Sequence, residues 1–365
     1  MIKAIKILLI AVLSVIVLFV LIVFRLFAIK LYDSSVQNAH MRTLKSYYQS
    51  ENFVPVDETE FVNFSLTDTT IKLNEIKMLA THNSYKKTGS DIGRFFVGLG
   101  DSFEEAKALK YGYKNLTDQF EAGVRSMEFD LRLRKTQFVL THVPLVDNSS
   151  VAPDFSQALE EIALFSSNHP NHIPIIILME IKDDWMILDH ALQVIESEDL
   201  ENLNLLLVDR LGNQLFTPQM MMETGKTLKE TIQTTGWPTV NSLLGKVIFV
   251  LHPGNFTDMY YELDESLTTQ PMFIGSYASG INQDYASFVV NNNPSVAEIE
   301  PLIQANFIVR TRIDSNLVFN QTDFDQAILS GAQILTSDFL IGRKDIKASD
   351  VIYFNDNKMV IRKNS

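Results

Sequence analysis

The sequence predicts an α/β fold, and within that class a TIM-type (β/α)8 barrel, regular or irregular, preceded by an N-terminal transmembrane helix. Three observations support this prediction. From Ile76 onward, short apolar runs alternate with helical stretches, which is typical of a parallel sheet. Ile173–Met179 is continuously apolar, as expected of a strand buried on both faces. Reactive side chains follow several of these runs, at the strand ends where such barrels build their sites.

The first element is an expected membrane anchor over residues 1–30. Ile7–Phe24 is apolar apart from Ser14, and at helical rise this run covers about 27 Å, close to the hydrocarbon thickness of a bilayer. The alternative is a cleaved signal peptide, whose apolar core is usually shorter and ends in a small-x-small site. Arg25 and Phe27 follow instead. We therefore expect a single uncleaved anchor helix.

The sequence bears less directly on which side of the membrane the C-terminal domain lies. The basic residues after the apolar run outnumber those before it, which does not favour export of the C-terminal part, but long domains translocate largely regardless of such counts. N-x-Ser/Thr sequons, which fit export, begin at Asn63, Asn115, Asn148, Asn255 and Asn320. An extracytoplasmic domain is the expectation.

Residues 31–70 are mixed and polar and are expected to form a juxtamembrane spacer before a single domain over 71–365. Strands are expected, in order, at Lys77–Thr81, Val124–Leu133, Gln137–Thr141, Ile173–Ile181, Lys246–Leu251, Phe307–Ile313 and Gln333–Thr336. Helices are expected at Asp101–Lys110, Asp154–Ser167 and Trp185–Glu198, with Asp154 as the N-cap of the second.

A barrel is preferred to an open doubly wound sheet because the reactive residues are spread over many strand ends. An open sheet would gather its site at one crossover, usually with a glycine-rich phosphate loop, and no such loop occurs in the sequence. The residues at or just past expected strand ends are His82, His142, Glu180, His252, Arg312 and Asp338.

Composition excludes several functions. Hydrophobic residues make up 46% and charged residues 21% of the 365 residues, which is typical of a globular chain. The net charge of −13 argues against a nucleic-acid partner, since phosphate backbones require basic surfaces. The absence of cysteine excludes disulfides, thiolate zinc sites and cysteine nucleophiles.

Two histidines are candidate acid–base residues. His82 follows one expected strand and precedes Asn83, whose amide can offer an oxygen to a cation, and His142 follows another strand. A histidine after a strand is usually structural, but two such residues can act together on a phosphodiester.

Glu128, Asp130 and Glu180, with Asn83, form a candidate all-oxygen ligand set. Glu128 and Asp130 lie two apart in a strand and so share a face, where their charges repel unless a cation lies between them. Oxygen donors select Ca²⁺ or Mg²⁺ over zinc. The alternative is a set of salt-bridged strand ends, because Arg125, Arg132 and Lys182 are close in sequence.

Lys182, Arg310 and Arg312 are candidate substrate-binding residues. The two arginines alternate along a strand, and guanidinium groups suit phosphate or polyol recognition. Lys182 serves the same site or only balances its charge. Asp338 is expected to be structural, and His169 and His172 are expected at the surface.

Segments spread over the whole domain resemble the Ca²⁺-dependent phosphatidylinositol-specific phospholipase C family of bacteria and fungi. They are Thr81–Tyr85, Ala122–Asp130, Met179–Asp183, Gly236–Thr239, Leu244–Val247, Val309–Asp314 and Ser330–Ile334, in order along residues 76–340. The resemblance implies a barrel that cleaves the glycerol–phosphate bond of an inositol phospholipid. It also implies catalytic roles for His82 and His142, and a Ca²⁺ ion, rather than Mg²⁺, held by Asn83, Glu128, Asp130 and Glu180.

The expected substrate is therefore a phospholipid at a membrane surface, and the expected products are diacylglycerol and a cyclic inositol phosphate. One departure from the family pattern is Ile313-Asp314, where such sequences usually carry Ala-Asp. The alternatives are a phosphodiesterase for glycerophosphodiesters or another headgroup on the same barrel, and a silent membrane-tethered lipid-binding module. The sequence leaves the oligomeric state open.

Overall fold

Within the described residues, eight strands pair in parallel and close into a barrel. The computed structural model describes residues 2–315, 317–340, 343 and 346–363. Around the barrel the strands are β1 (Ile76–Thr81), β2 (Ser126–Arg134), β4 (Ile175–Ile181), β6 (Val247–Leu251), β7 (Phe273–Ser276), β8 (Phe288–Val290), β9 (Ile308–Arg312) and β12 (Ile334–Ser337), which pairs with β1. The predicted barrel is confirmed.

The strand register brings polar side chains to one rim. Asp130 lies opposite Glu180 across the β2–β4 pair, and Thr336 lies opposite Arg312 across the β12–β9 pair. The strands themselves are rich in buried Ile, Val, Leu and Phe, and β4 is buried along almost its whole length. Because all eight strands run the same way, their C-terminal residues converge at the same end of the barrel.

The strand β3 (Gln137–Leu140) lies outside the barrel. It pairs antiparallel with the C-terminal half of β2, from Leu131 to Arg134, which extends beyond the rim. The chain thereby returns to the rim and delivers His142 there. The short strand β5 (Leu192–Gln193) also pairs with the end of β2. Two further additions are β13 (Val360–Arg362), antiparallel on β1, and a separate pair of β10 (Asp314–Ser315) and β11 (Val318–Phe319).

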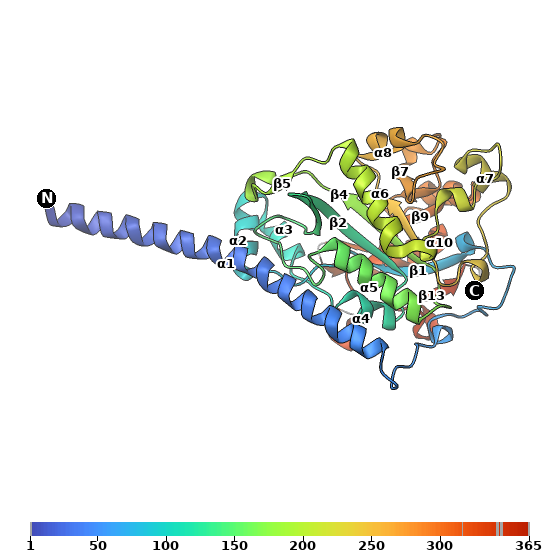
Figure 1. The fold of residues 1–365 in the computed structure, drawn as a ribbon, viewed down its shortest axis with the longest axis horizontal. Helices are drawn as coiled ribbons and strands as arrows, with labels where there is room; N and C mark the ends of the chain where they lie inside the picture. Colours follow the sequence, from blue (N-terminus) through green and yellow to red (C-terminus); the bar gives the residue numbers. More distant parts are fainter. Residues whose placement is uncertain (1, 316, 341–342, 344–345, 364–365) are drawn as a thin grey trace.

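The barrel is surrounded by helices (Figure 1). They are α2 (Asp91–Gly100), α3 (Phe103–Ala108), α4 (Leu116–Glu121), α5 (Phe155–Asn168), α6 (Ser197–Leu211), α7 (Leu228–Thr234), α8 (Thr257–Leu263), α9 (Val296–Gln304) and α10 (Gln321–Ser330). The predicted N-cap of α5 is confirmed, since the Asp154 carboxylate accepts a hydrogen bond from the Gln157 N–H at 3.0 Å. Buried α5 residues such as Leu159 and Phe165 pack on the barrel core.

Helix α1 (Ile2–Tyr48) is continuous over 47 residues, about 70 Å at helical rise. Its N-terminal half projects away from the barrel, with exposed apolar side chains, and its C-terminal half runs beside α5 (Figure 1). By length and composition the projecting half could cross a membrane, as an anchor or as a signal sequence.

The C-terminal half of α1 is docked through one face. Its buried residues are Leu26, Asp33, Gln37, Met41 and Leu44, a spacing that follows the helical period. Residues 31–48 are therefore part of a helix that packs on the barrel domain. The docked face could not be recognised from sequence, because two of its buried side chains, Asp33 and Gln37, are polar. The division of the chain into 1–30, 31–70 and 71–365 stays a prediction.

Paired hydrogen bonds explain how polar α1 residues can be buried. Gln37 exchanges two hydrogen bonds with the Asp154 backbone, donating to the carbonyl at 3.0 Å and accepting from the N–H at 2.9 Å. Asp33 accepts from Lys87 at 2.7 Å and from the Ser150 N–H at 3.1 Å. These bonds satisfy groups that would otherwise be costly to bury.

Some elements differ from the sequence-based expectations. Residues 185–198 are not the expected helix but contain a 3₁₀ turn at Met186–Leu188, the strand β5 and the first residues of α6. The short strands β7 and β8 were not anticipated. His169 and His172, expected at the surface, are 3% and 0% exposed.

Candidate active site

The structure brings the predicted site residues to the C-terminal rim of the barrel. His82 and Asn83 follow β1, Glu128 and Asp130 lie in β2, and His142 follows β3. The remaining residues are Glu180 in β4, Lys182 just after it, and Arg310 and Arg312 in β9.

One ring nitrogen of His82 is held by a buried carboxylate. The Nδ1 atom lies 3.0 Å from Asp338 Oδ1 and 3.1 Å from the Tyr111 hydroxyl, while Nε2 lies 3.9 Å from Glu128 Oε1. Burial opposes the charge on Asp338, but His82 and Arg312 outweigh it and lower the pKa of this carboxyl. A carboxylate at Nδ1 fixes the ring and leaves Nε2 as the atom that can exchange a proton.

His142 also has a carboxylate near Nδ1, at ion-pair distance but without hydrogen-bond geometry. Its Nδ1 lies 3.3 Å from Asp147 Oδ2, and the other oxygen of Asp147 accepts a hydrogen bond from Lys86 at 2.8 Å. Burial opposes the charge on Asp147, but Lys86 and His142 outweigh it and lower its pKa. Asp147 is 1% exposed, so this carboxylate is a fixed partner for the imidazole.

Sequence reasoning missed both carboxylates. Asp338 was expected to be structural, and Asp147 was not singled out. Asp338 is 256 positions from His82, and only the closure of β12 onto β1 brings them together. For Asp147 the available signal was its position five residues after His142, in a loop that bends back on itself through the Asp147 N–H to Val143 carbonyl bond at 3.0 Å.

The strand carboxylates are paired with cations. Glu128 accepts a hydrogen bond from Arg310, and although burial opposes its charge, Arg310 and His82 outweigh it and lower the pKa of Glu128 to about 2. Lys182 Nζ lies 3.6 Å from Asp130 Oδ1 and 3.3 Å from Glu180 Oε2. Burial lowers the pKa of Lys182, but these two carboxylates outweigh it and raise the pKa above its ordinary value.

The four candidate metal ligands all offer oxygen atoms, and oxygen donors suit a hard cation such as Ca²⁺. Asp130 Oδ2 accepts from the Tyr85 hydroxyl at 2.8 Å, but its buried Oδ1 accepts no hydrogen bond from any described residue. Asn83 has a left-handed backbone (φ 47°) and donates its amide to Tyr111 at 3.1 Å. Within the described ranges no three His, Asp or Glu side chains form a ready metal cluster. Arg310 and Lys182 engage the carboxylates instead.

Arg312 lies between two other carboxylates. Its Nη2 is 3.3 Å from Asp338 Oδ2 and 3.8 Å from Asp314 Oδ1. Burial lowers the pKa of Arg312, but the carboxylates outweigh it and raise the pKa. Burial and the charge of Asp338 raise the pKa of Asp314 to about 6. Arg312 of β9 thus pairs with Asp338, the same carboxylate that contacts His82.

Two cavities open on either side of Lys182 and Asp184. One is polar, has a volume of about 200 Å³, and is lined by Glu180, His252 and Tyr277 among others. The other has a volume of about 400 Å³ and is lined by His142 together with mostly apolar side chains, including Leu145 and Trp185. Lys182 and Asp184 therefore line both a polar and an apolar space, and His142 lines the apolar one.

A family model described as phosphoinositide phospholipase C, Ca²⁺-dependent, matches residues 71–135 and 131–365. None of the curated proteins matches the chain.

Solved structures with a similar fold include a calcium-dependent phosphoinositol-specific phospholipase C from a Pseudomonas species. In its myoinositol complex that structure has a TM-score of 0.60 and 18% identity, and the match covers 84% of this chain and 99% of that one. A Ca²⁺-dependent phosphatidylinositol-specific phospholipase C from Streptomyces antibioticus has a TM-score of 0.54 and 16% identity, covering 74% of this chain and 95% of that one.

Proposed function

Because this chain belongs to the Ca²⁺-dependent phosphoinositide phospholipase C family, whose members are phosphodiesterases, we propose that it cleaves the glycerol–phosphate bond of phosphatidylinositol-type phospholipids. The products are diacylglycerol and an inositol phosphate that is first cyclic. The observation that carries the proposal is the pair of rim histidines, His82 and His142, each with a buried carboxylate at Nδ1.

The proposed reaction uses the two Nε2 atoms in opposite senses. The imidazole of His82 accepts the proton of the inositol hydroxyl next to the phosphate, and that oxygen forms a new bond to phosphorus. The bond from phosphorus to the glycerol oxygen breaks in line, and His142 gives its proton to this oxygen. We assign the acid role to His142 because it lines the apolar cavity, the side suited to a diacylglycerol leaving group.

Asn83, Glu128, Asp130 and Glu180 are the residues that would hold a Ca²⁺ ion. When bound, the ion supplies charge that stabilises the phosphate and lowers the pKa of the inositol hydroxyl. The Asp130 Oδ1 atom, which accepts no hydrogen bond from a described residue, and the all-oxygen donor set support the assignment. Lys182 pairs with two of the four candidate ligands and so competes with a cation for them.

The polar cavity is the proposed headgroup site. Its Tyr277 ring lies edge-on to His252, with centroids 6.1 Å apart, and remains 47% exposed, so an aromatic face is available for a sugar-like ring. Lys182, Arg310 and Arg312 supply the cations for phosphate and hydroxyl groups. The similar Pseudomonas enzyme has been solved with myoinositol.

Helix α1 is the proposed anchor, uncleaved, with the barrel on the extracytoplasmic side. Its projecting apolar half supports this assignment. An anchor keeps an enzyme with a lipid substrate at the surface where that substrate occurs.

The test is an assay of the full-length protein in proteoliposomes that contain phosphatidylinositol, phosphatidylcholine or phosphatidylethanolamine, with glycerophosphoinositol as a soluble arm. We expect diacylglycerol release from phosphatidylinositol alone, and its loss in excess chelator. Equal rates with and without chelator would remove the Ca²⁺ assignment. A clear preference for glycerophosphoinositol would replace the proposed substrate.

A further inference from the structure

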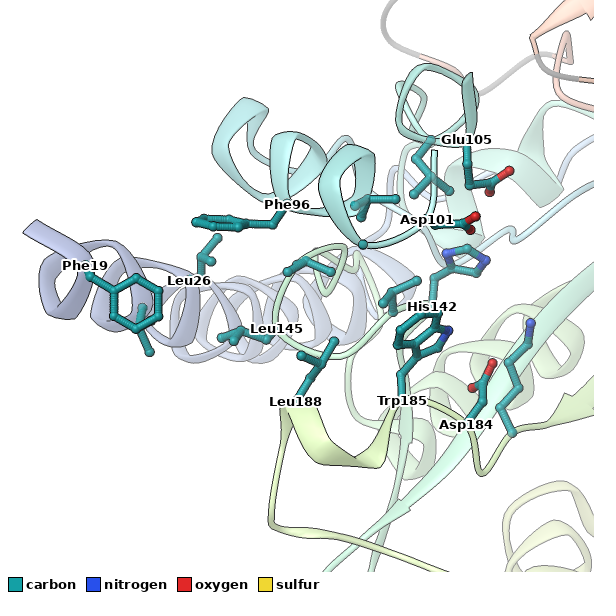
Figure 2. A pocket seen from close by; sticks show the side chains of 17 residues that line it. Phe19, Leu26, Phe96, Asp101, Glu105, His142, Leu145, Asp184, Trp185 and Leu188 are labelled. Atoms are coloured by element: carbon teal, nitrogen blue, oxygen red, sulfur yellow. The ribbon is translucent and has the colours of Figure 1, made fainter. Parts of the chain in front are cut away.

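The apolar groove beside His142 reaches the projecting helix α1. Figure 2 shows Phe19 and Leu26 of α1 at one end of the groove and His142 and Trp185 at the other. The groove has a volume of about 400 Å³, and Phe96 of α2 lines it between the two ends. One connected space therefore joins the candidate catalytic histidine to the expected membrane span.

The α1 wall of this groove is held in a fixed position. Leu26 is 2% exposed, and its carbonyl accepts a hydrogen bond from Asn148 at 3.1 Å. Farther along the same helix, Gln37 is bonded twice to the Asp154 backbone, and His40 pairs with buried Glu161 at 2.9 Å. A helix held at so many points cannot move away from the barrel without unfolding its own contacts.

Exposed apolar side chains lie on the elements that line the groove. Phe95, Leu99 and Phe103 on α2 and α3 are 51%, 62% and 62% exposed, and Trp185 and Ile187 beside the 3₁₀ turn are 45% and 78% exposed. Apolar residues concentrated in this way, with a tryptophan among them, are typical of surfaces that contact a membrane.

The two ends of the groove differ in chemistry, and this difference identifies the occupant. The inner end is polar: it carries His142 and Lys182, which suit a phosphoester, together with the carboxylates of Asp101, Glu105 and Asp184 (Figure 2). The outer end is built from the side chains Phe19 and Val23 of an apolar span. A molecule that fits both ends has a phosphate and an apolar chain joined together. That molecule is a diacyl phospholipid.

We propose that α1 is part of the substrate site: the groove between α1, α2 and the Trp185–Leu188 turn binds the glycerol backbone and the first acyl carbons of the lipid. This inference rests on the proposed function for the identity of the headgroup, but not for the groove itself. The lipid enters sideways from the bilayer that contains α1, and diacylglycerol leaves by the same route.

The test uses the full-length protein and two tryptophan substitutions in α1. Val23→Trp fills the groove, whereas Leu21→Trp is the matched control. Leu21 lies about 160° around the helix from Val23, at nearly the same depth, is 58% exposed and does not line the groove. Insertion of both variants is checked by flotation with liposomes. Rates are measured on bilayer phosphatidylinositol and on a soluble inositol phosphodiester without acyl chains.

We expect Val23→Trp to lower the bilayer rate at least tenfold while the soluble rate stays within twofold of wild type, and Leu21→Trp to change neither. Equal bilayer rates for the two variants would overturn the proposal. So would an equal loss on both substrates, because that loss would lie at the reacting centre. If the wild type acts on neither substrate, the proposed function is rejected. Lipid binding in the groove is then tested by the labelling experiment alone.

The labelling experiment needs no turnover. Full-length protein in nanodiscs is irradiated with phosphatidylinositol that carries a diazirine near the carbonyl end of one acyl chain. We expect labelled peptides containing Phe96 or Leu188, which lie outside the span, and loss of this label in Val23→Trp but not in Leu21→Trp. Label confined to the span would overturn the proposal. Label that disappears as protein density rises would instead assign the groove to a second copy of the chain.

Discussion

At the residue scale, the candidate site combines two histidines with buried carboxylates near their Nδ1 atoms. Asp338 and Asp147 each contact a Nδ1 atom, and each has a pKa lowered by neighbouring cations in spite of burial. The sequence showed the histidines because they stand at strand ends, but their partners depend on barrel closure and on a loop that bends back. Residue types near strand ends can be predicted, whereas contacts across the barrel cannot.

Substitution of the histidines tests their roles. His82→Ala and His142→Ala should each lower kcat by about 10²–10⁴-fold, the usual contribution of a positioned acid–base group. The double variant should be far less than multiplicatively slower because the two residues act in one reaction. His190, which is exposed and lines neither of the two cavities, is the control, and His190→Ala should keep the wild-type kcat. A normal rate in either single variant would remove that histidine from the mechanism.

Lys182 offers a test of the metal assignment that does not need turnover. Its ammonium lies within 4 Å of both Asp130 and Glu180, so its removal should increase the affinity of these carboxylates for a cation. We expect Lys182→Met to lower the Kd for Ca²⁺ by about tenfold in calorimetric titration of the full-length protein, since losing one nearby positive charge is worth about 1.4 kcal/mol. Lys229 of α7 is half-buried and lines neither of the two cavities, so Lys229→Met provides the control substitution. An unchanged Kd in Lys182→Met would place the ion elsewhere.

His172 predicts how stability depends on pH. Burial, followed by the effect of Arg125, lowers its pKa to about 3, while its Nε2 contacts Ser166 at 2.8 Å. In the unfolded chain His172 is protonated as the pH falls below about 6.5, whereas in the folded chain it stays neutral until about pH 3. The contribution of His172 is therefore complete above pH 6.5 and is lost as the pH falls toward 3, by up to about 1.4 kcal/mol per pH unit.

The measurement is urea unfolding of detergent-solubilised protein between pH 4 and 7.5, for wild type, His172→Gln and the control His190→Gln. The difference in unfolding free energy between wild type and His172→Gln should shrink as the pH falls, while the control should follow the wild type. A difference that is constant over the range would contradict a neutral buried His172.

At the scale of elements, long apolar strands were predicted from sequence and short ones were not. β4 and β6 stand out as buried runs, whereas β7 and β8 have four and three residues, too few for a period to be visible. The expected helix over residues 185–198 fails for a local reason. Trp185 has a left-handed backbone (φ 55°), and Asp189 accepts hydrogen bonds from Arg134 at 2.8 Å and from the Ala191 N–H at 3.0 Å, which ends the turn.

Truncation of α1 separates its two halves. Deletion of residues 2–24 removes no fully buried side chain, since only Ile22 and Val23 in this range are half-buried, and should leave the free energy of unfolding nearly unchanged. Deletion of residues 2–48 also removes the buried apolar side chains Leu26, Met41 and Leu44, and it leaves buried Glu161 without His40. At about 1.5–3 kcal/mol per buried apolar side chain, the loss of these three should cost about 4.5–9 kcal/mol. Urea midpoints of the two proteins compare them, and equal midpoints would mean that the docking of α1 contributes nothing.

At the scale of the whole molecule, the closed barrel gathers residues from distant parts of the sequence at one rim. Its polar and apolar cavities lie on either side of Lys182, and α1 leads from the apolar one toward the bilayer. Class and barrel type followed from the sequence because many strand ends carried reactive residues. The contact between α1 and the barrel did not follow, because Asp33 and Gln37 are polar and gave no core pattern.

Because α1 is one unbroken helix, the number of residues between its membrane-spanning part and its docked part sets the direction in which Phe19 and Val23 point. Each residue inserted after Phe24 would turn Phe19 and Val23 by about 100° and raise them by about 1.5 Å relative to the barrel. One added alanine should therefore turn the groove-facing side chains away, while four should return them to within about 40° of the starting angle. Activity on bilayers should fall and then partly recover as alanines are added, whereas a flexible connection would give no such oscillation. The orientation of the membrane-spanning face would thus be encoded in the number of residues between it and the barrel.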